Sequence, residues 1–149
     1  MRAVIQRVDR AGVRINNKET SSIKEGILIL LGVEKEDTRS DADYILDKTI
    51  NLRIFEDEQG KMNLSLLDVN GEMMVVSQFT LLGDCTKGWR PSFFKAEEPA
   101  MANELYKYFI REGSLRVKKL ACGEFQEMMQ IELVNNGPIT ILLDSKKNF

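Results

Sequence analysis

Histidine is absent from the 149 residues of this chain. Histidine is the commonest general base at neutral pH, and it completes the Ser-His-Asp and Cys-His nucleophile systems. Its absence excludes those systems and every zinc site that has an imidazole ligand. Acid–base chemistry in this chain would therefore fall to carboxylates, lysine, tyrosine, the backbone or the substrate itself.

Cysteine is scarce as well, since Cys85 and Cys122 are the only two. Two isolated cysteines without histidine build neither a disulfide framework nor a structural zinc site. We therefore expect no metal and no other cofactor. A chain without a disulfide framework is typical of the reducing cytoplasm, which is the compartment that we expect.

Long apolar runs are also missing. The longest, Ile27 to Leu31, is far shorter than the roughly 20 residues that a membrane helix needs, and Met1 to Gln6 lacks the apolar core of a secretory signal. The formal net charge of −2 offers no global basic surface for wrapping a duplex. We expect no membrane partner, and any contact with nucleic acid must be local.

The most informative stretch runs from Met73 to Leu82. It begins as an apolar β-type run and then carries hydrogen-bonding side chains. In a strand, Ser77 and Phe79 would share one face, while Gln78 and Thr80 would share the other. Polar groups in a buried strand cost free energy unless they find partners. Two interpretations stay open: the groups are satisfied internally, or the strand ends in a pocket where a ligand completes them.

An unusual loop from Gly83 to Phe94 follows, with two glycines, a proline, two cations and three aromatic residues. Loops on a rigid scaffold often carry function. Lys87 and Arg90 are able to bind a phosphate there, and the aromatic rings are able to stack on a base. The alternative is a long surface crossing with its aromatic side chains packed beneath it.

The pattern predicts two main helices. The first begins at a capping box formed by Ser40 and Asp43 and runs to about Arg53. The second begins at Pro99, a residue favoured at the first helical position, and ends at Gly113. The buried stripe expected for the second helix is Met101, Leu105, Tyr108 and Phe109.

The rest of the chain is typical of strands joined by turns. Asn70-Gly71 predicts a hairpin that would place the strand from Met73 antiparallel to its predecessor. Residues 114–120 favour a strand whose basic face, Arg116 and Lys118, is either solvated or in contact with RNA. We expect one α+β domain over residues 1–149, with a mostly antiparallel, curled or barrel-like sheet. The other strands are expected over residues 2–8, 12–18, 26–33, 128–134 and 139–143.

A proline stands between the last two expected strands, in Asn135-Asn136-Gly137-Pro138. A tight turn is where a cis X-Pro bond would occur, but cis is found in only about one X-Pro bond in twenty. Taken alone, these residues favour a trans bond.

Four segments together resemble the D-aminoacyl-tRNA deacylases, over essentially the whole length of the chain. Each segment is a weak indication by itself, but four in order in a chain of this length are specific. The matching segments are Met1–Val8, Ser77–Leu81, Gly88–Phe93 and Asn136–Thr140.

The resemblance implies a cytoplasmic homodimer that hydrolyses the ester joining a D-amino acid to the acceptor end of tRNA, and that also clears glycine from alanine tRNA. In the family the Gly-Pro pair, here Gly137-Pro138, carries a cis bond and reaches into the active site of the partner subunit. Its carbonyls occupy the space that an L side chain would need, so selection is by exclusion of L-amino acids. Arg7 matches the residue that braces this pair.

The resemblance also changes the interpretation of Thr80. It looks like a nucleophile, but no evident base is present to activate it. The family is understood to use the 2′-hydroxyl of the terminal adenosine, while the protein contributes position and backbone hydrogen bonds. Ser77, Gln78, Phe79 and Thr80 would then line the catalytic pocket.

One segment departs from the family pattern. Family members commonly carry a small Gly-Ala pair where this chain has Gln126-Glu127. If the segment borders the pocket, the bulkier residues would change the range of substrates rather than the type of reaction.

Three alternatives remain. The first is a relative that removes L-amino acids, against which Ser77-Gln78 argues. The second is a small-ester hydrolase with Thr80 as its nucleophile. The third is a non-catalytic RNA- or DNA-binding module, which the acidic net charge disfavours.

Overall fold

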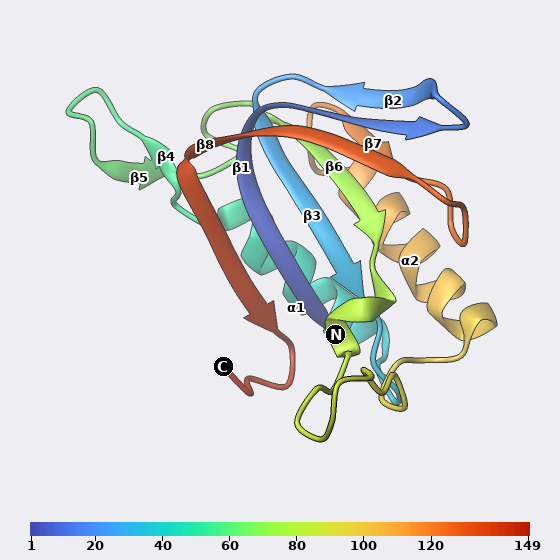
Figure 1. Cartoon of the computed structure of the whole chain (residues 1–149). Helices are drawn as coiled ribbons and strands as arrows, with labels where there is room; N and C mark the ends of the chain where they lie inside the picture. Colours follow the sequence, from blue (N-terminus) through green and yellow to red (C-terminus); the bar gives the residue numbers. More distant parts are fainter.

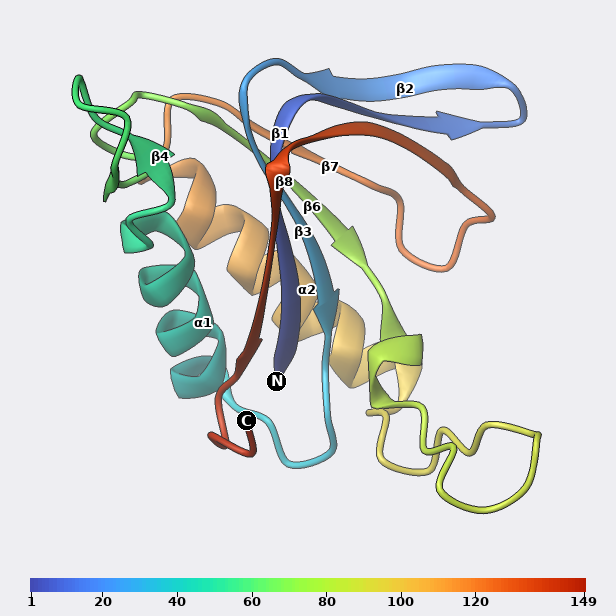
Figure 2. The same cartoon turned by 60° about the vertical axis from the view of Figure 1, so that its left-hand side comes forward.

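The computed structural model describes all residues, 1–149, and consists of a curled mixed sheet with two helices packed on one face (Figures 1 and 2). The order of strands is β2-β1-β3-β6-β7, with β8 also paired to β1. The expected α+β domain with a curled, barrel-like sheet is confirmed. The elements are β1 (Arg2–Ile15), β2 (Lys18–Ile23), β3 (Gly26–Gly32), α1 (Arg39–Asn51), β4 (Phe55–Glu56), β5 (Met62–Leu64), β6 (Glu72–Ser77), the 3₁₀ helix η1 (Phe79–Leu82), α2 (Pro99–Ser114), β7 (Leu120–Cys122) and β8 (Gln130–Asp144).

Strand β1 organises the antiparallel part of the sheet, since it pairs with β2, β3 and β8. The two strands expected over 128–134 and 139–143 form one continuous strand, β8, which follows β1 along its length. The pairing of β1 with β8 shifts register around Val8, opposite Asn135. At this irregularity β8 bends sharply (Figure 1), and the bend contains Gly137-Pro138.

Strand β6 is parallel to both β3 and β7, so the hairpin expected at Asn70-Gly71 is wrong. Residues 66–70 form turns instead, and the Gly71 N–H donates to the Leu66 carbonyl at 3.0 Å. The physical reason lies in the apolar residues that follow. Met73 to Val76 are at most 1% exposed, which is the pattern of a strand covered on both faces and not of an edge hairpin.

Strand β6 ends at Ser77, earlier than the sequence predicts. The Gln78 N–H still donates to the Leu31 carbonyl of β3 at 2.8 Å, and residues 79–82 then wind into η1. The expected alternation of faces from Ser77 to Thr80 is therefore wrong, because a 3₁₀ turn does not alternate its side chains as a strand does.

Helix α1 begins two residues earlier than expected, because its N-cap is Thr38 and not Ser40. Its capping box is formed by Thr38 and Asp41, not by Ser40 and Asp43, and the Thr38 N–H donates to Asp41 Oδ2 at 2.8 Å. Helix α2 begins at Pro99 as predicted and ends at Ser114.

The core-facing stripe of α2 is rotated from the expected one. Met101 is 52% exposed, and Tyr108 places its hydroxyl on Asp43 of α1 at 2.8 Å, so neither belongs to the buried stripe. The side chains that pack in the core also recur at helical spacing, but the series begins at Ala102 and not at Met101. They are Ala102, Leu105, Tyr106 and Phe109, with Gly113 against β7.

The strand expected over residues 114–120 is also wrong. Arg116 and Val117 donate their N–H groups to the Gly113 carbonyl, which makes a turn, and β7 begins only at Leu120. Arg116 and Lys118 therefore form no basic strand face. The Arg116 guanidinium instead lies 2.8 Å from the Asp47 carboxylate of α1.

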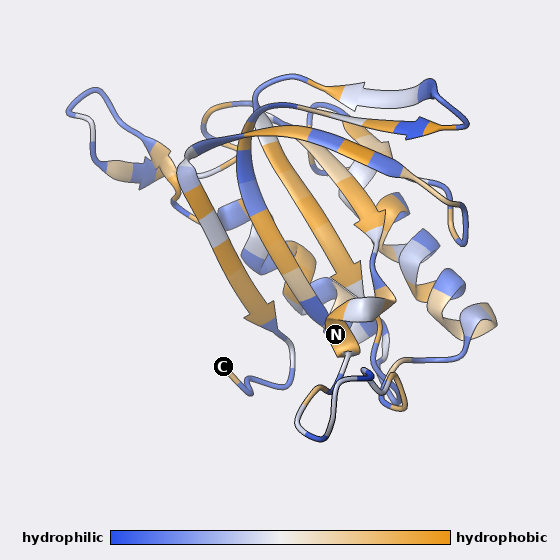
Figure 3. Ribbon diagram, in the orientation of Figure 1, coloured by the Kyte–Doolittle hydropathy of each residue, from blue (hydrophilic) through white to orange (hydrophobic).

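The main hydrophobic core lies between the helices and the sheet. Apolar residues run the length of β3 and the buried part of β6 (Figure 3), and they pack against Ile45, Leu46 and Ile50 of α1 and Phe109 of α2. No helix is both long enough and apolar enough to cross a membrane.

A close approach of β3 and β6 yields a stability prediction. A Cβ atom on Gly26 would lie 1.8 Å from the Glu72 carbonyl oxygen, whereas one on Gly12 would meet only the Glu19 carboxylate end, at 3.3 Å. We expect Gly26→Ala to lower the free energy of unfolding by about 3 kcal/mol, because backbone must move, and Gly12→Ala by less than about 1 kcal/mol. Urea denaturation of both variants measures the difference, and equal losses would contradict the close approach.

Candidate active site

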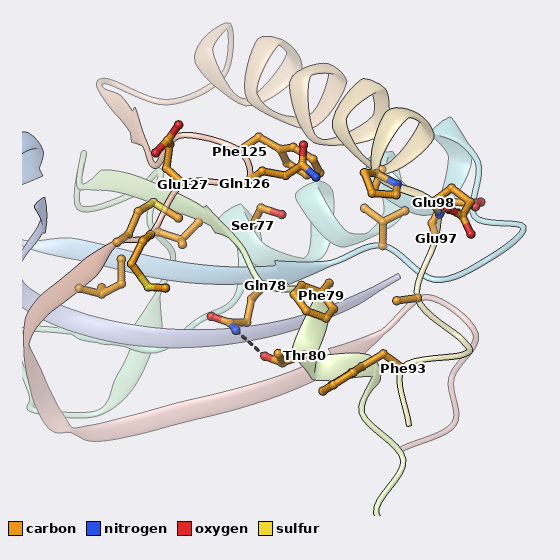
Figure 4. Close-up of a pocket in the computed structure, with 18 residues that line it drawn as sticks. Ser77, Gln78, Phe79, Thr80, Phe93, Glu97, Glu98, Phe125, Gln126 and Glu127 are labelled. Atoms are coloured by element: carbon orange, nitrogen blue, oxygen red, sulfur yellow. Dashed lines mark hydrogen bonds between the residues drawn. The ribbon is translucent and has the colours of Figure 1, made fainter. Parts of the chain in front are cut away.

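A pocket of about 850 Å³ opens where β6 ends (Figure 4). Four parts of the chain enclose it: the end of β6 with η1, the loop before α2, the first turn of α2, and the segment between β7 and β8. The lining side chains are mostly apolar, and they include all four residues that the sequence singled out. These four are Ser77, Gln78, Phe79 and Thr80.

The Gln78 and Thr80 side chains satisfy one another, because the Gln78 carboxamide donates to the Thr80 hydroxyl oxygen (dashed line in Figure 4). Ser77 stands at the end of β6, half-buried in the pocket wall. No lysine or arginine lines the pocket. Thr80 therefore has an amide as its partner rather than a group that would take its proton.

The Gln78 N–H donates to the Leu31 carbonyl, and the first hydrogen bond of η1 runs from the Leu81 N–H to the Gln78 carbonyl at 3.2 Å. The N–H groups of Phe79 and Thr80 precede that bond, so they have no carbonyl partner within η1. Both residues line the pocket, and their backbone donors stand at its wall. Such donors are suited to stabilising negative charge that develops on an ester oxygen.

The aromatic residues join the loop to the pocket. The Phe79 and Phe93 rings meet edge to face with centroids 5.1 Å apart, at an interplanar angle of 71°. A Cβ atom on Gly83 would lie 3.0 Å from the Phe93 ring, so glycine permits this contact. The loop is thereby fixed to the pocket wall at Phe93.

The opposite wall comes from the segment between β7 and β8. The Tyr106 hydroxyl of α2 lies 3.0 Å from the carbonyl oxygens of Val75 and Gly123, and it ties this segment to β6. Burial raises the pKa of Tyr106, so the phenol stays protonated and serves as a hydrogen-bond donor. Its role is to hold the wall in place.

The two residues that depart from the family pattern both line the pocket. Gln126 has a φ of 65°, a left-handed conformation that glycine adopts without cost and that strains a longer side chain. Glu127 follows it on the same wall (Figure 4). This chain therefore places a carboxamide and a carboxylate on a wall where a Gly-Ala pair, as the resemblance leads us to expect, would leave more space.

Three glutamates form an acidic rim of the pocket, which the sequence does not predict. Glu97 and Glu98, which precede α2, line it together with Glu127. Two adjacent glutamates before Pro99 predict only a favourable interaction with the helix dipole. Nothing in the local sequence brings them opposite a segment near residue 127, because that juxtaposition depends on the packing of α2 against β6 and β7.

Gly137-Pro138 lies outside this pocket, at the exposed bend of β8. Its peptide bond is cis, so the trans bond favoured by the residues alone is wrong and the expectation from the family is confirmed. Arg7 is 6% exposed and lies directly beneath the bend. Its Nε and Nη2 donate to the Asn136 carbonyl and carboxamide oxygens at 3.3 and 2.9 Å, and its Nη1 donates to the Ile54 carbonyl at 2.6 Å.

The expected cations do not converge on one surface. Lys87 and Arg90 lie on the exposed loop whose base borders the pocket. Arg116 and Lys118 follow the opposite end of α2, a helix of 16 residues and therefore roughly 24 Å long. The structure thus separates these two pairs.

Comparisons with known proteins agree over the whole chain. The family model described as D-Tyr-tRNA(Tyr) deacylase matches residues 4–144. A D-aminoacyl-tRNA deacylase of Syntrophus aciditrophicus (strain SB) is 60% identical over 149 residues, and one of Natranaerobius thermophilus is 53% identical over 150 residues. Both alignments cover 100% of each chain.

A solved structure described as c-Myc DNA Unwinding Element Binding Protein is also similar. It has a TM-score of 0.92 at 38% sequence identity and covers 97% of this chain and 98% of its own. With family model, full-length relatives and fold in agreement, the chain belongs to the D-aminoacyl-tRNA deacylases, hydrolases that act on aminoacyl-tRNA.

Proposed function

We propose that this protein hydrolyses the ester of D-aminoacyl-tRNA, and of glycine wrongly attached to alanine tRNA, in the cytoplasm. The observation that carries the proposal is the pocket at Ser77–Thr80, which offers hydrogen-bond donors without a basic side chain. Such a pocket is suited to a substrate that brings its own reactive hydroxyl. An aminoacyl-tRNA does so, because the 2′-hydroxyl of its terminal adenosine lies next to the ester.

In this mechanism the 2′-hydroxyl assists hydrolysis and the protein supplies orientation and electrostatic stabilisation. The N–H groups of Phe79 and Thr80, at the start of η1, would donate hydrogen bonds to the carbonyl oxygen as negative charge develops on it. Ser77 and the Phe79 ring would border the aminoacyl group. Positioning and oxyanion stabilisation each contribute about 3 kcal/mol or more without a side-chain base.

Selection of D- over L-amino acids would come from Gly137-Pro138 of a partner subunit in a homodimer. In its own chain the pair is exposed and does not line the pocket. A two-fold axis would bring each pair to the other subunit's pocket reciprocally. The carbonyls of the pair would then fill the space of an L side chain, whereas a D side chain points elsewhere and glycine has none.

The bend that carries Gly137-Pro138 is held by side chains. The Asn135 carboxamide donates to the Arg7 carbonyl of β1 at 3.0 Å and to the Ile139 carbonyl, beyond the bend, at 2.8 Å. Asn135 therefore connects the two sides of the bend to each other and to β1. Asn136 donates to Asp9 Oδ1 at 2.5 Å and accepts from Arg7. This network supports the assignment of Arg7 as the brace, because a selection by exclusion needs the excluding carbonyls fixed in place.

The proposal predicts chiral discrimination in a direct assay. Release of amino acid from D-tyrosyl-tRNA should exceed release from matched L-tyrosyl-tRNA by at least about 100-fold, the scale of a steric exclusion of roughly 3 kcal/mol. Single-turnover release from the two labelled substrates measures the ratio. Equal rates would overturn the proposed function.

Thr80 distinguishes assistance by the 2′-hydroxyl from nucleophilic catalysis by the protein. Thr80→Ala removes only the hydrogen bond from Gln78, so we expect deacylation to fall by less than about tenfold. A nucleophile would cost several orders of magnitude. Activity as low as that of an uncatalysed control would favour a Thr80 nucleophile.

If the hydrogen bonds of Asn135 hold the bend in place, their removal should lower the selectivity for D-amino acids and not the rate of deacylation itself. Asn135→Asp replaces the amide that donates to two carbonyl oxygens with a carboxylate, which cannot donate. The bend should loosen, and the ratio of the deacylation rates on D- and L-tyrosyl-tRNA should fall about tenfold. Asn51→Asp, an exposed change on α1, is the matched control. Dimer content and thermal unfolding of both variants separate this effect from a general loss of structure, and an unchanged ratio would refute the role of Asn135.

A further inference from the structure

The only tryptophan of the chain, Trp89, is completely exposed, with a relative accessibility of 102%. Tryptophan is normally well buried, since exposing its large apolar ring to water is unfavourable. Trp89 makes no contact that would explain its position within the fold. Tryptophan is enriched at binding interfaces, so an exposed indole beside a pocket is a candidate contact for a ligand.

The loop that carries Trp89 is a hairpin closed by hydrogen bonds at its base. Asp84 and Ser92 exchange two backbone hydrogen bonds, of 2.8 and 2.9 Å, which close its base. Asp84 Oδ1 accepts from both the N–H and the hydroxyl of Thr86, and these bonds hold the pKa of Asp84 below its usual range. Gly88 has a φ of 69°, which turns the chain just before Trp89. We call residues 84–92 the Trp89 hairpin.

The charges of the Trp89 hairpin favour a polyanion. Lys87 and Arg90 flank the ring, and neither forms an ion pair with a carboxylate of the chain. The pocket, in contrast, is lined by three glutamates and by no cation. A phosphodiester chain that leaves the pocket on this side would therefore meet positive charge at the hairpin.

The hairpin stands directly beside the pocket. Phe93 follows it and lines the pocket against Phe79, and the hairpin projects from the body next to η1 (Figure 2). Trp89 precedes Ser92 by three positions, a span of about 10 Å in extended chain. That distance corresponds to roughly three stacked nucleotides at about 3.4 Å each.

We propose that Trp89 stacks on a nucleobase of the single-stranded acceptor end, within about three nucleotides of the terminal adenosine, while Lys87 and Arg90 bind its phosphates. The inference rests on the proposed function, because the acceptor end must enter the pocket. Stacking on an aromatic ring needs only the π-face of a base, which an unpaired nucleotide leaves accessible. The hairpin thus adds a second binding site that senses the polynucleotide and not the amino acid.

Two substrates test the stacking contact. On D-tyrosyl-tRNA, Trp89→Ala should raise KM about tenfold with little change in kcat. On D-tyrosyl-adenosine, which has no further nucleotides, the same variant should match the wild type. Trp89→Phe keeps an aromatic ring and should restore most of the affinity. Leu115→Ala is the control, because Leu115 is also an exposed apolar residue, at 78%, and lies beyond the far end of α2.

Fluorescence offers an independent readout, since Trp89 is the only indole. An RNA minihelix that ends in single-stranded CCA should quench the emission, and the same minihelix with a blunt end should quench it much less. Equal losses on both substrates, no change in KM, or no difference between the two minihelices would overturn the stacking contact. A Trp89→Ala variant that loses only dimer content in sedimentation would assign the ring to a protein interface instead.

Failure of the stacking contact is distinguishable from failure of the proposed function. If wild-type protein releases D-tyrosine from neither substrate, the deacylase proposal fails. The minihelix titration still decides whether Trp89 binds a single-stranded end.

Discussion

Burial of β6 on both faces is the constraint on which the site depends. Met73 to Val76 are covered by α2 on one side and by the inner surface of the curled sheet on the other, and they run parallel to β3 and β7. A strand so placed must leave the core where its apolar residues end. That point is Ser77, and the change from β6 to η1 there leaves the Phe79 and Thr80 N–H groups without a partner in either element's regular ladder, beside the pocket.

The wall opposite is kept in register with β6 by Tyr106. A single buried hydroxyl lies within hydrogen-bond distance of both the Val75 carbonyl of β6 and the Gly123 carbonyl that precedes residues 124–129. Buried polar groups are costly when unpaired, so this arrangement fixes the distance between the two walls. Gln126 and Glu127 lie outside this anchor, so it does not depend on their side chains.

The molecule separates its recognition tasks by their electrostatic character. The pocket is apolar with a rim of glutamates, and the bend at Gly137-Pro138 is held by amide hydrogen bonds and the Arg7 guanidinium. Two cations without an ion pair, Lys87 and Arg90, lie on the Trp89 hairpin. In the function that we propose, the ester, the amino acid and the polyanionic tail of the substrate would each meet one of these regions, so a net charge of −2 does not oppose binding of a tRNA end.

The sequence by itself determined the class of fold, the beginning of α2 at Pro99, the lining residues Ser77 to Thr80 and the family, because these depend on local patterns and ordered motifs. It did not determine the parallel direction of β6, since Asn70-Gly71 is locally a good hairpin turn. The parallel pairing with β3 and β7 follows from the burial of β6 on both faces, which depends on the tertiary structure. It also did not reveal that Glu97, Glu98 and Glu127 share a rim, that Arg116 pairs with Asp47, or that Asn135 clasps the bend. These relations join residues far apart in the chain, and only the tertiary packing of α2, β6 and β8 brings them together.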